Sequence, residues 1–361
     1  MKVSRTAKYS LLAIAAASML ASCSSINYYA QAAQGQLSLL NDSRPIEEWL
    51  GDQHTDARLK LRLATARQIR TFAVQELGLP DNKSYRNYAS LARPFVLWNV
   101  VATPELSLKP IQWCFPVAGC VSYKGYYGKE DALAFARELR AEGKDVQVGG
   151  VPAYSTLGWF NDPLISTFIF YPDAELARLL FHELSHQVVY VQGDSQFNES
   201  FASAVEEAGV ERWLSGYGNE AMRANYLQFS ARKKQFLKLL LACRRDLEAN
   251  YASHASAAEK RAQKARLFDQ LKADYQLLKA SWGGFAGYVR FFAEPLSNAH
   301  LASIATYNDF IPAFRALLAR EKTFPKFYAA AKALADLDKK ERHKRLEAMA
   351  ASAPVVALSH Q

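Results

Sequence analysis

The chain has 361 residues, of which 50% are hydrophobic and 22% are charged. This composition excludes a largely disordered protein, because disordered chains lack the apolar residues needed to build a core. Lys and Arg number 44 against 35 Asp and Glu, a formal net charge of +9, which on its own would suit a nucleic-acid or anionic-membrane partner. Residues 1–22 hold three of these basic residues and no acid, so removing them reduces the surplus to +6, which names no partner.

The first predicted element is a targeting segment. A charged start precedes an apolar run over residues 9–21, which is shorter than the roughly 20 residues needed to span a bilayer and has the proportions of a signal-peptide core. The run ends in Leu20-Ala21-Ser22-Cys23, which resembles the bacterial lipobox. We therefore predict a lipoprotein signal peptide over residues 1–22 and acylation of Cys23, with an uncleaved anchor or an ordinary signal peptide as alternatives.

A lipid on Cys23 implies a location. The protein would be anchored to a membrane of the bacterial cell envelope and face the periplasm, and Ser24 after the cysteine favours the outer membrane. Two further cysteines, Cys114 and Cys120, flank a stretch whose proline and glycine favour a turn. In an oxidising compartment we predict a disulfide between them, with two free thiols as the alternative.

The remaining elements in chain order predict a mainly α fold with a small β-sheet (α+β). Periodic apolar positions indicate helix from about residue 26 to 79, and branched and aromatic residues indicate a strand over 94–102. Next come a helix over 129–142, strands over 145–148 and 167–171, and helices over 173–187 and 198–213. Beyond residue 219 long helices follow, ending in a tract over 329–349.

The basic surplus is concentrated in one part of these long helices. Residues 221–280 contain 13 Lys and Arg against 5 Asp and Glu, which exceeds the whole surplus of the chain after residue 22. A solvated face on an exposed helix pair explains this pattern, and a binding patch for anionic lipid, cell-wall polymer or nucleic acid is the alternative. No nucleic-acid-binding motif accompanies the charge, so we expect no nucleic-acid partner.

The segment that carries chemistry is Phe181-His182-Glu183-Leu184-Ser185-His186. On a helix, His182 and His186 lie one turn apart on the same face and can reach one metal ion, while Glu183 lies beside them as a general base. This is the H-E-x-x-H pattern of zinc metallopeptidases. The competing interpretation is two core-facing histidines beside a surface glutamate.

A third metal ligand can come from two places in families with this motif. The metzincin pattern needs a glycine and a third histidine where this chain has Val189 and Gln192, so that route is excluded. The gluzincin pattern takes a glutamate from the following helix, which points to Glu199 in Asn198-Glu199-Ser200-Phe201-Ala202. Other carboxylates nearby are alternative ligands or partners that orient a histidine: Asp194, Glu206 and Glu207.

These motifs resemble those of aminopeptidase N-like gluzincins, although only 12 residues separate His186 from Glu199 here. The chain is similar over most of its length to a family of bacterial zinc aminopeptidases with a lipoprotein signal. The resemblance implies a gluzincin-like core with long C-terminal helices. We expect an N-terminal helical region and zinc-peptidase core over 23–218, and a predominantly helical region over 219–361 packed on the same catalytic unit.

By the same resemblance, the stretch before the zinc helix lines the substrate cleft. Five of its residues are the predicted peptide contacts, and a packed turn is the alternative: Tyr154, Ser155, Thr156, Leu157 and Gly158. The strand over 167–171 would pair with the peptide, and Asp162 is a candidate for binding the substrate amine. Candidates for stabilising the oxyanion are Tyr154, Tyr217 and Tyr226.

The predicted function is therefore zinc-dependent hydrolysis of peptide bonds, with an aminopeptidase implied by the resemblance. One zinc ion would be held by His182, His186 and Glu199, with Glu183 as general base. The alternative is a non-catalytic envelope lipoprotein whose structural zinc site accompanies binding of a polymer or a protein partner.

Overall fold

The structure is a computed structural model that describes residues 28–115, 119–302, 304 and 310–352. It is mainly helical with small sheets, which confirms the predicted α+β class. The predicted signal peptide and the acylation site Cys23 lie outside the described residues. No helix among the described residues is long and apolar enough to cross a membrane.

The N-terminal part is largely helical, as predicted for residues 26–79, but it is divided into several elements. A helix covers residues 28–41, and it is followed by β1 (Arg44–Pro45), α2 (Ile46–Gly51) and α3 (Ala57–Gln75). Pro45 interrupts the first helical segment because its ring fixes φ and removes a backbone donor. Asp56 starts α3 by accepting a hydrogen bond from the backbone N–H of Leu59 at 3.0 Å.

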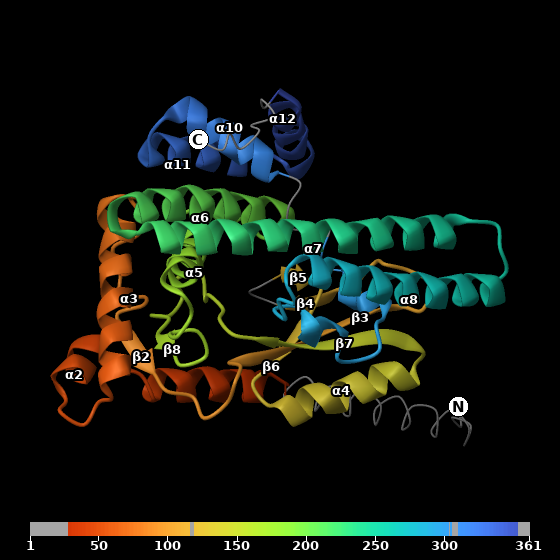
Figure 1. The fold of residues 1–361 in the computed structure, drawn as a ribbon, viewed down its shortest axis with the longest axis horizontal. Coiled ribbons are helices and arrows are strands. Elements are labelled where there is room, and N and C mark those ends of the chain that lie inside the picture. Colours follow the sequence, from red (N-terminus) through yellow and green to blue (C-terminus); the bar gives the residue numbers. More distant parts are fainter. Residues whose placement is uncertain (1–27, 116–118, 303, 305–309, 353–361) are drawn as a thin grey trace, which may run out of the picture.

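Three small sheets lie on one side of the molecule (Figure 1). In the largest, β3 (Leu97–Pro104) pairs antiparallel with β6 (Lys124–Tyr126) and with β7 (Lys144–Val151). Helix α4 (Lys129–Ala141) packs on this sheet through a small apolar core. The other two sheets join β1 to β2 (Asn87–Ala89) and β8 (Leu164–Ile165), and β4 (Trp113–Phe115) to β5 (Gly119–Val121).

The strand predicted over residues 167–171 is wrong. Only Leu164–Ile165 pair in a sheet, and the chain then turns, because the backbone N–H groups of Phe168 and Ile169 both bond to the carbonyl of Ile165 (3.2 and 3.1 Å). Phe168 and Ile169 are nonetheless buried. A short apolar run that enters the core through a turn has the same composition as a strand, which explains the error.

The helices that follow form the body of the molecule. Helices α5 (Asp173–Ser185) and α6 (Ser195–Tyr217) pack on each other, and α6 lies alongside α7 (Glu220–Ala252) (Figure 1). Helix α7 pairs with α8 (Ala257–Ser281) through a separate apolar core that includes the buried Cys243. A 3₁₀ turn (Val289–Phe292) and the short α9 (Asn298–Ala302) then return the chain to β3.

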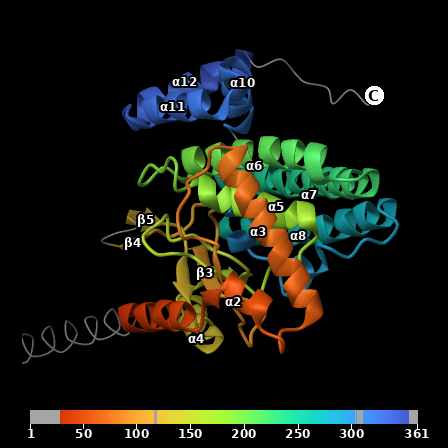
Figure 2. The ribbon, with the colours of Figure 1, turned by 90° about the vertical axis from the view of Figure 1, so that its left-hand side faces the viewer.

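The C-terminal helices lie on the side of α6 that faces away from α5 (Figures 1 and 2). They are α10 (Ile311–Glu321), α11 (Phe324–Ala335) and α12 (Lys339–Ser352). The tract predicted over residues 329–349 is helical, as expected, and comprises parts of α11 and α12 with a break at residues 336–338. The main core runs from Leu39 to Leu346, so the C-terminal helices share it with α5 and α6.

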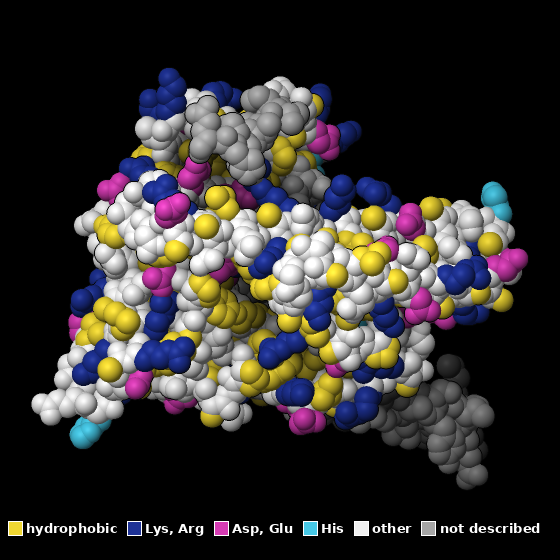
Figure 3. All heavy atoms as spheres, viewed as in Figure 1, with side chains coloured by type: hydrophobic (Ala, Val, Ile, Leu, Met, Phe, Trp, Pro, Cys, Tyr) yellow, Lys and Arg dark blue, Asp and Glu magenta, His cyan; other side chains and the backbone are white. Residues whose placement is uncertain are grey.

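Charged residues are mixed on the long helices. Arg261 pairs with Glu105 at 2.8 Å and Lys264 pairs with Asp145 at 2.6 Å, so acids from the β3 region offset part of the basic surplus of residues 221–280. Figure 3 shows acidic side chains between the basic ones on this face. The surplus therefore fits a solvated helix pair better than a binding patch of one sign.

Candidate metal centre

Helix α5 carries His182 and Glu183, and His186 follows at its C-cap. The guanidinium of Arg62, from α3, fixes the start of α5 by bonding to the Asp173 carboxylate and to the carbonyls of Ile169 and Tyr171 (2.9 and 2.6 Å). The helix then buries a broad apolar face against the core, formed by Leu176, Ala177, Leu180, Phe181 and Leu184. This anchoring leaves the histidines on the side that faces α6.

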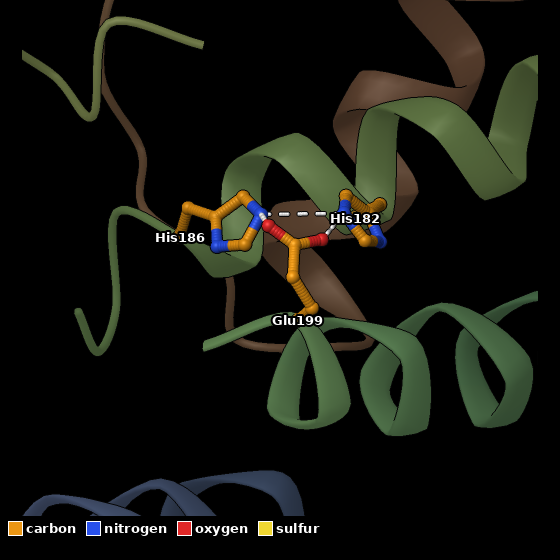
Figure 4. Close-up of side chains that lie close together, drawn as sticks. All are labelled: His182, His186 and Glu199. Carbon is orange, nitrogen blue, oxygen red and sulfur yellow. Dashed lines mark hydrogen bonds and ion pairs between the residues drawn. The ribbon is translucent and has the colours of Figure 1, made fainter. Parts of the chain in front are cut away.

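His182, His186 and Glu199 meet between α5 and α6 (Figure 4). The Nε2 atoms of the two histidines lie 3.2 Å apart, and the Glu199 carboxylate oxygens lie 3.2 Å from His182 Nε2 and 3.7 Å from His186 Nε2. One ligand atom from each residue lies within 4.8 Å of the others. Helix α6 begins at Ser195, earlier than predicted, and places Glu199 in its second turn. The three residues predicted as ligands therefore form one group.

A buried carboxylate holds the first histidine in position. Glu206, also on α6 and only 5% exposed, lies 2.8 Å from His182 Nδ1. Arg178 bridges Glu206 (3.2 Å) and Glu175 (2.8 Å), so the carboxylate is itself oriented. Because Nδ1 bonds to Glu206, Nε2 is the nitrogen that faces Glu199. Glu206 therefore orients His182 and is not itself one of the three grouped residues.

Burial and neighbouring charges shift the pKa values of the two histidines, and the carboxylates favour a positive charge in this group. Burial lowers the pKa of His182, but the carboxylates of Glu206 and Glu199 outweigh it and raise that pKa to about 10. Burial and the neighbouring charge of His182 lower the pKa of His186 to about 4. One imidazole is thus cationic and the other neutral in the metal-free protein. Two imidazole nitrogens and one carboxylate are also the donor set of many catalytic zinc sites, so the residues fit a divalent metal ion.

Glu183 lies next to the three grouped side chains and forms no part of their hydrogen bonds. Burial, with the charges of Glu199, Asp162 and Glu206, raises the pKa of its carboxyl to about 7, against the opposing charge of His182. A carboxyl that exchanges its proton near neutral pH is suited to act as both base and acid.

Two tyrosines near the group were not among the predicted residues. The Tyr190 ring packs edge-on against His186, with centroids 6.2 Å apart, and is 41% exposed. Burial of the Tyr123 hydroxyl, together with the charges of Tyr190, Glu199 and Glu183, raises the pKa of Tyr123 to about 12, although its ring is partly exposed. Only tertiary contacts bring Tyr123 here, so the sequence gives no spacing from which to find it.

Tyr123 follows a hairpin stapled by a disulfide. Strands β4 and β5 are joined by the Cys114–Cys120 bond. The hairpin abuts the segment after α5, because a Cβ on Gly119 would lie 3.2 Å from the Gln192 side chain. The hairpin and the segment from residue 190 to 193 therefore form one border of the metal group.

The loop that is predicted to contact the peptide is held in place by internal hydrogen bonds. Asp162, only 3% exposed, accepts hydrogen bonds from the backbone and hydroxyl of Thr156 (2.9 and 2.8 Å) and from the hydroxyl of Ser155 (3.5 Å). These bonds occupy the carboxylate that is the candidate for binding the substrate amine. The Tyr154 hydroxyl bonds to that of Tyr127 at 2.7 Å, so it is also part of the internal structure.

The end of this loop lies beside the metal helix. Leu157 and Gly158 both have left-handed backbones (φ of 58° and 84°), and a Cβ on Gly158 would lie 3.8 Å from the side chain of Gln187, the residue after His186. The next residue, Trp159, is 72% exposed. A strained turn next to the metal group is consistent with a role for the loop in binding.

The alternative ligands have other partners. Asp194 is buried and bonds to Arg342 and His343, and Glu207 pairs with Arg315. Tyr217, a candidate for the oxyanion, packs instead on Trp213 and Phe72. Among these residues only Glu206 contacts the predicted ligands, as the partner of His182.

Fold and site together define a mainly helical α+β protein with an H-E-x-x-H helix and a His–His–Glu group that could hold a metal ion. The model of a family described as "Putative aminopeptidase" matches residues 27–346. The chain belongs to this family. No match to a curated protein or to a solved structure was found.

Proposed function

We propose that this protein is a zinc-dependent peptidase, and specifically an aminopeptidase. The observation that carries the proposal is the convergence of His182, His186 and Glu199 from two packed helices within 4.8 Å, with Glu183 beside them. Membership of the aminopeptidase family supports a peptide as the substrate.

His182, His186 and Glu199 would hold the ion. A zinc ion at such a site acidifies water and polarises a carbonyl. Glu183 accepts the proton of the attacking water and passes it to the nitrogen of the leaving amine, a relay that suits a carboxyl whose pKa is raised to about 7. The hydroxyls of Tyr123 and Tyr190, two partly exposed residues, are the proposed donors to the oxyanion, in place of the tyrosines that the sequence suggests.

The proposed cellular location is the periplasmic face of a bacterial envelope membrane, reached through a lipid on Cys23. The resemblance of residues 20–23 to a lipobox supports this proposal. Mass spectrometry of the mature protein should find an acylated Cys23, and an unmodified Cys23 would contradict the location.

The mechanism is tested by Glu183→Gln, which preserves size and removes the base. We expect this variant to bind zinc as the wild type does and to lose peptide hydrolysis by about 10²-fold or more. The matched control is Glu211→Gln, which changes an exposed glutamate further along α6 and should leave both properties unchanged. Hydrolysis by Glu183→Gln at the wild-type rate would contradict the mechanism.

A further inference from the structure

A buried ion cluster joins the last helix to the start of α6. Asp194, 1% exposed, accepts a hydrogen bond from Arg342 Nε (2.9 Å) and forms an ion pair with Arg342 Nη2 (2.8 Å), and His343 Nε2 lies 2.9 Å from the same carboxylate. Arg342 is 3% exposed. We call Asp194, Arg342 and His343 the α6–α12 cluster. Its burial and its paired geometry distinguish it from the exposed ion pairs elsewhere, which contribute little.

The cluster fixes the first turn of α6, directly before Glu199. Asp194 is the N-cap of this helix and accepts a bond from the backbone N–H of Phe197 at 3.3 Å. Both neighbours of Glu199 are also fixed. The Asn198 amide bonds to the N–H and C=O of Val191 at 2.8 Å each, and the Ser200 hydroxyl accepts a bond from the backbone N–H of Phe310 at 3.3 Å.

The start of α6 needs contacts from other parts of the protein, because the segment between the ligands His186 and Glu199 is short and largely irregular. Only 12 residues separate His186 from Glu199, and none of the residues from 187 to 194 belongs to a helix or strand. The direction of α6 relative to α5 therefore depends on what holds the Asp194 end. Arg342 is suited to that task, because it also donates to the carbonyls of Ala335 (3.1 Å) and Leu337 (2.7 Å) where α11 meets α12.

Other contacts from the C-terminal helices reach the same end of α6. Lys339 Nζ donates to the carbonyl of Gly193 at 3.0 Å, and the Arg342 guanidinium lies 5.4 Å from the Phe197 ring centroid. The His343 ring packs edge-on against Phe310, with centroids 4.9 Å apart. In Figure 1, α6 lies between the metal helix α5 on one side and these C-terminal helices on the other.

We propose that Arg342 and His343 are positioning residues for the metal centre, acting through Asp194 to set the place of the Glu199 carboxylate relative to His182 and His186. The C-terminal helices thereby determine metal affinity from outside the site. This inference rests on the proposed metal site and adds a determinant that the ligand motif does not contain.

The experiment measures metal affinity in the full mature protein with Zn²⁺ and Co²⁺ in competition with a chelator, together with the visible spectrum of the Co²⁺ form. The variants are Arg342→Met, Arg342→Lys and His343→Gln. The matched control is Arg315→Ala, which removes another contact between the C-terminal helices and α6, the exposed pair with Glu207. Helical content by circular dichroism and unfolding of the metal-free protein report on folding.

We expect Arg342→Met and His343→Gln to weaken metal affinity at least about tenfold, the size seen when groups supporting a ligand are lost, and to alter the Co²⁺ spectrum. Arg342→Lys should recover part of the affinity, and Arg315→Ala should keep all of it. If Arg342→Met fails to fold, His343→Gln decides the question.

Three results would overturn the inference. The first is wild-type affinity and spectrum in folded His343→Gln, and in Arg342→Met if that variant folds. The second is an equal loss of affinity in Arg315→Ala, which would indicate a general effect of the C-terminal helices on stability. A wild-type protein that binds no metal would overturn the proposed function as well, whereas the first two results leave that function standing.

Discussion

Glu206 does not belong to the predicted ligand set, yet it contacts the imidazole of one ligand. Its carboxylate lies 2.8 Å from His182 Nδ1 and is held by Arg178. Partners of this kind fix the orientation of a histidine ligand and raise its basicity. The residue thus links the packing of α6 to the chemistry of α5.

We expect Glu206→Gln to weaken zinc affinity about 10- to 100-fold, because the amide can still accept a bond from His182 but no longer carries the charge. Competition with a chelator measures this change. Glu207→Gln, one residue further along the same helix, is the control and should bind zinc normally. Equal affinities for all three proteins would show that Glu206 has no influence on the site.

At the scale of single residues, the sequence predicts those residues whose spacing along a helix places them on one face. The four-residue interval between His182 and His186 and the position of Glu199 lead directly to the observed group. Tyr123 could not be found in this way, because it reaches the site through the disulfide hairpin.

Single elements show where sequence patterns fail. The apolar run over 167–171 enters the core through a turn rather than a strand, and Pro45 lies at a break in a region whose periodicity indicates helix without showing its divisions. Helices with caps that are visible in the sequence were predicted more closely. Thus α4 was expected over 129–142 and is found at Lys129–Ala141, closed by the left-handed Gly143.

The start of α6 gives a prediction about pH. Burial raises the pKa of Asp194, but hydrogen bonds from His343 and Arg342 outweigh it, and the net pKa is lowered. A lowered pKa in the folded state contributes stability above the unfolded pKa, about 3.9, and this contribution is lost as the pH falls below that value. Asp194→Asn should therefore reduce the free energy of unfolding of the metal-free protein by about 3 kcal/mol at pH 7.

The difference between Asp194→Asn and the wild type should shrink below about pH 4, because Asp194 takes up a proton there in the unfolded chain and does so in the folded protein only at a lower pH. Urea unfolding at pH 7 and pH 3.5 measures both quantities. Asp269→Asn, at an exposed position on α8, should match the wild type at each pH. A difference between Asp194→Asn and the wild type that stays constant down to pH 3.5 would contradict the assigned role of the carboxylate.

At the scale of the whole molecule, one core connects the metal helices with the C-terminal helices. The Phe314 ring on α10 is fully buried. Its centroid lies 5.2 and 5.7 Å from the ring centroids of Phe197 and Phe201 on α6. It lies 6.3 Å from the ring centroid of Phe327 on α11. Helices α7 and α8 have their own apolar core. The long-range arrangement of these cores follows from tertiary packing and was not evident from local periodicity.

This arrangement predicts how a core defect spreads. Phe314→Ala should reduce the free energy of unfolding by about 3–5 kcal/mol. Native-state hydrogen exchange should accelerate in α6 and α11 together and much less in α8. Leu277→Ala, at a position 72% exposed on α8, is the control and should change little. Acceleration confined to α10 and α11 would show that the C-terminal helices unfold independently of the metal helices.

The most direct test of the proposed activity is cleavage of matched peptides with free and acetylated N-termini by the zinc-loaded mature protein. We predict release of free amino acids from the unblocked peptides alone, lost on removal of zinc with a chelator and in Glu183→Gln. Equal cleavage of the blocked peptides would contradict the aminopeptidase assignment. A protein that holds zinc at His182, His186 and Glu199 and cleaves neither set would contradict the peptidase function itself.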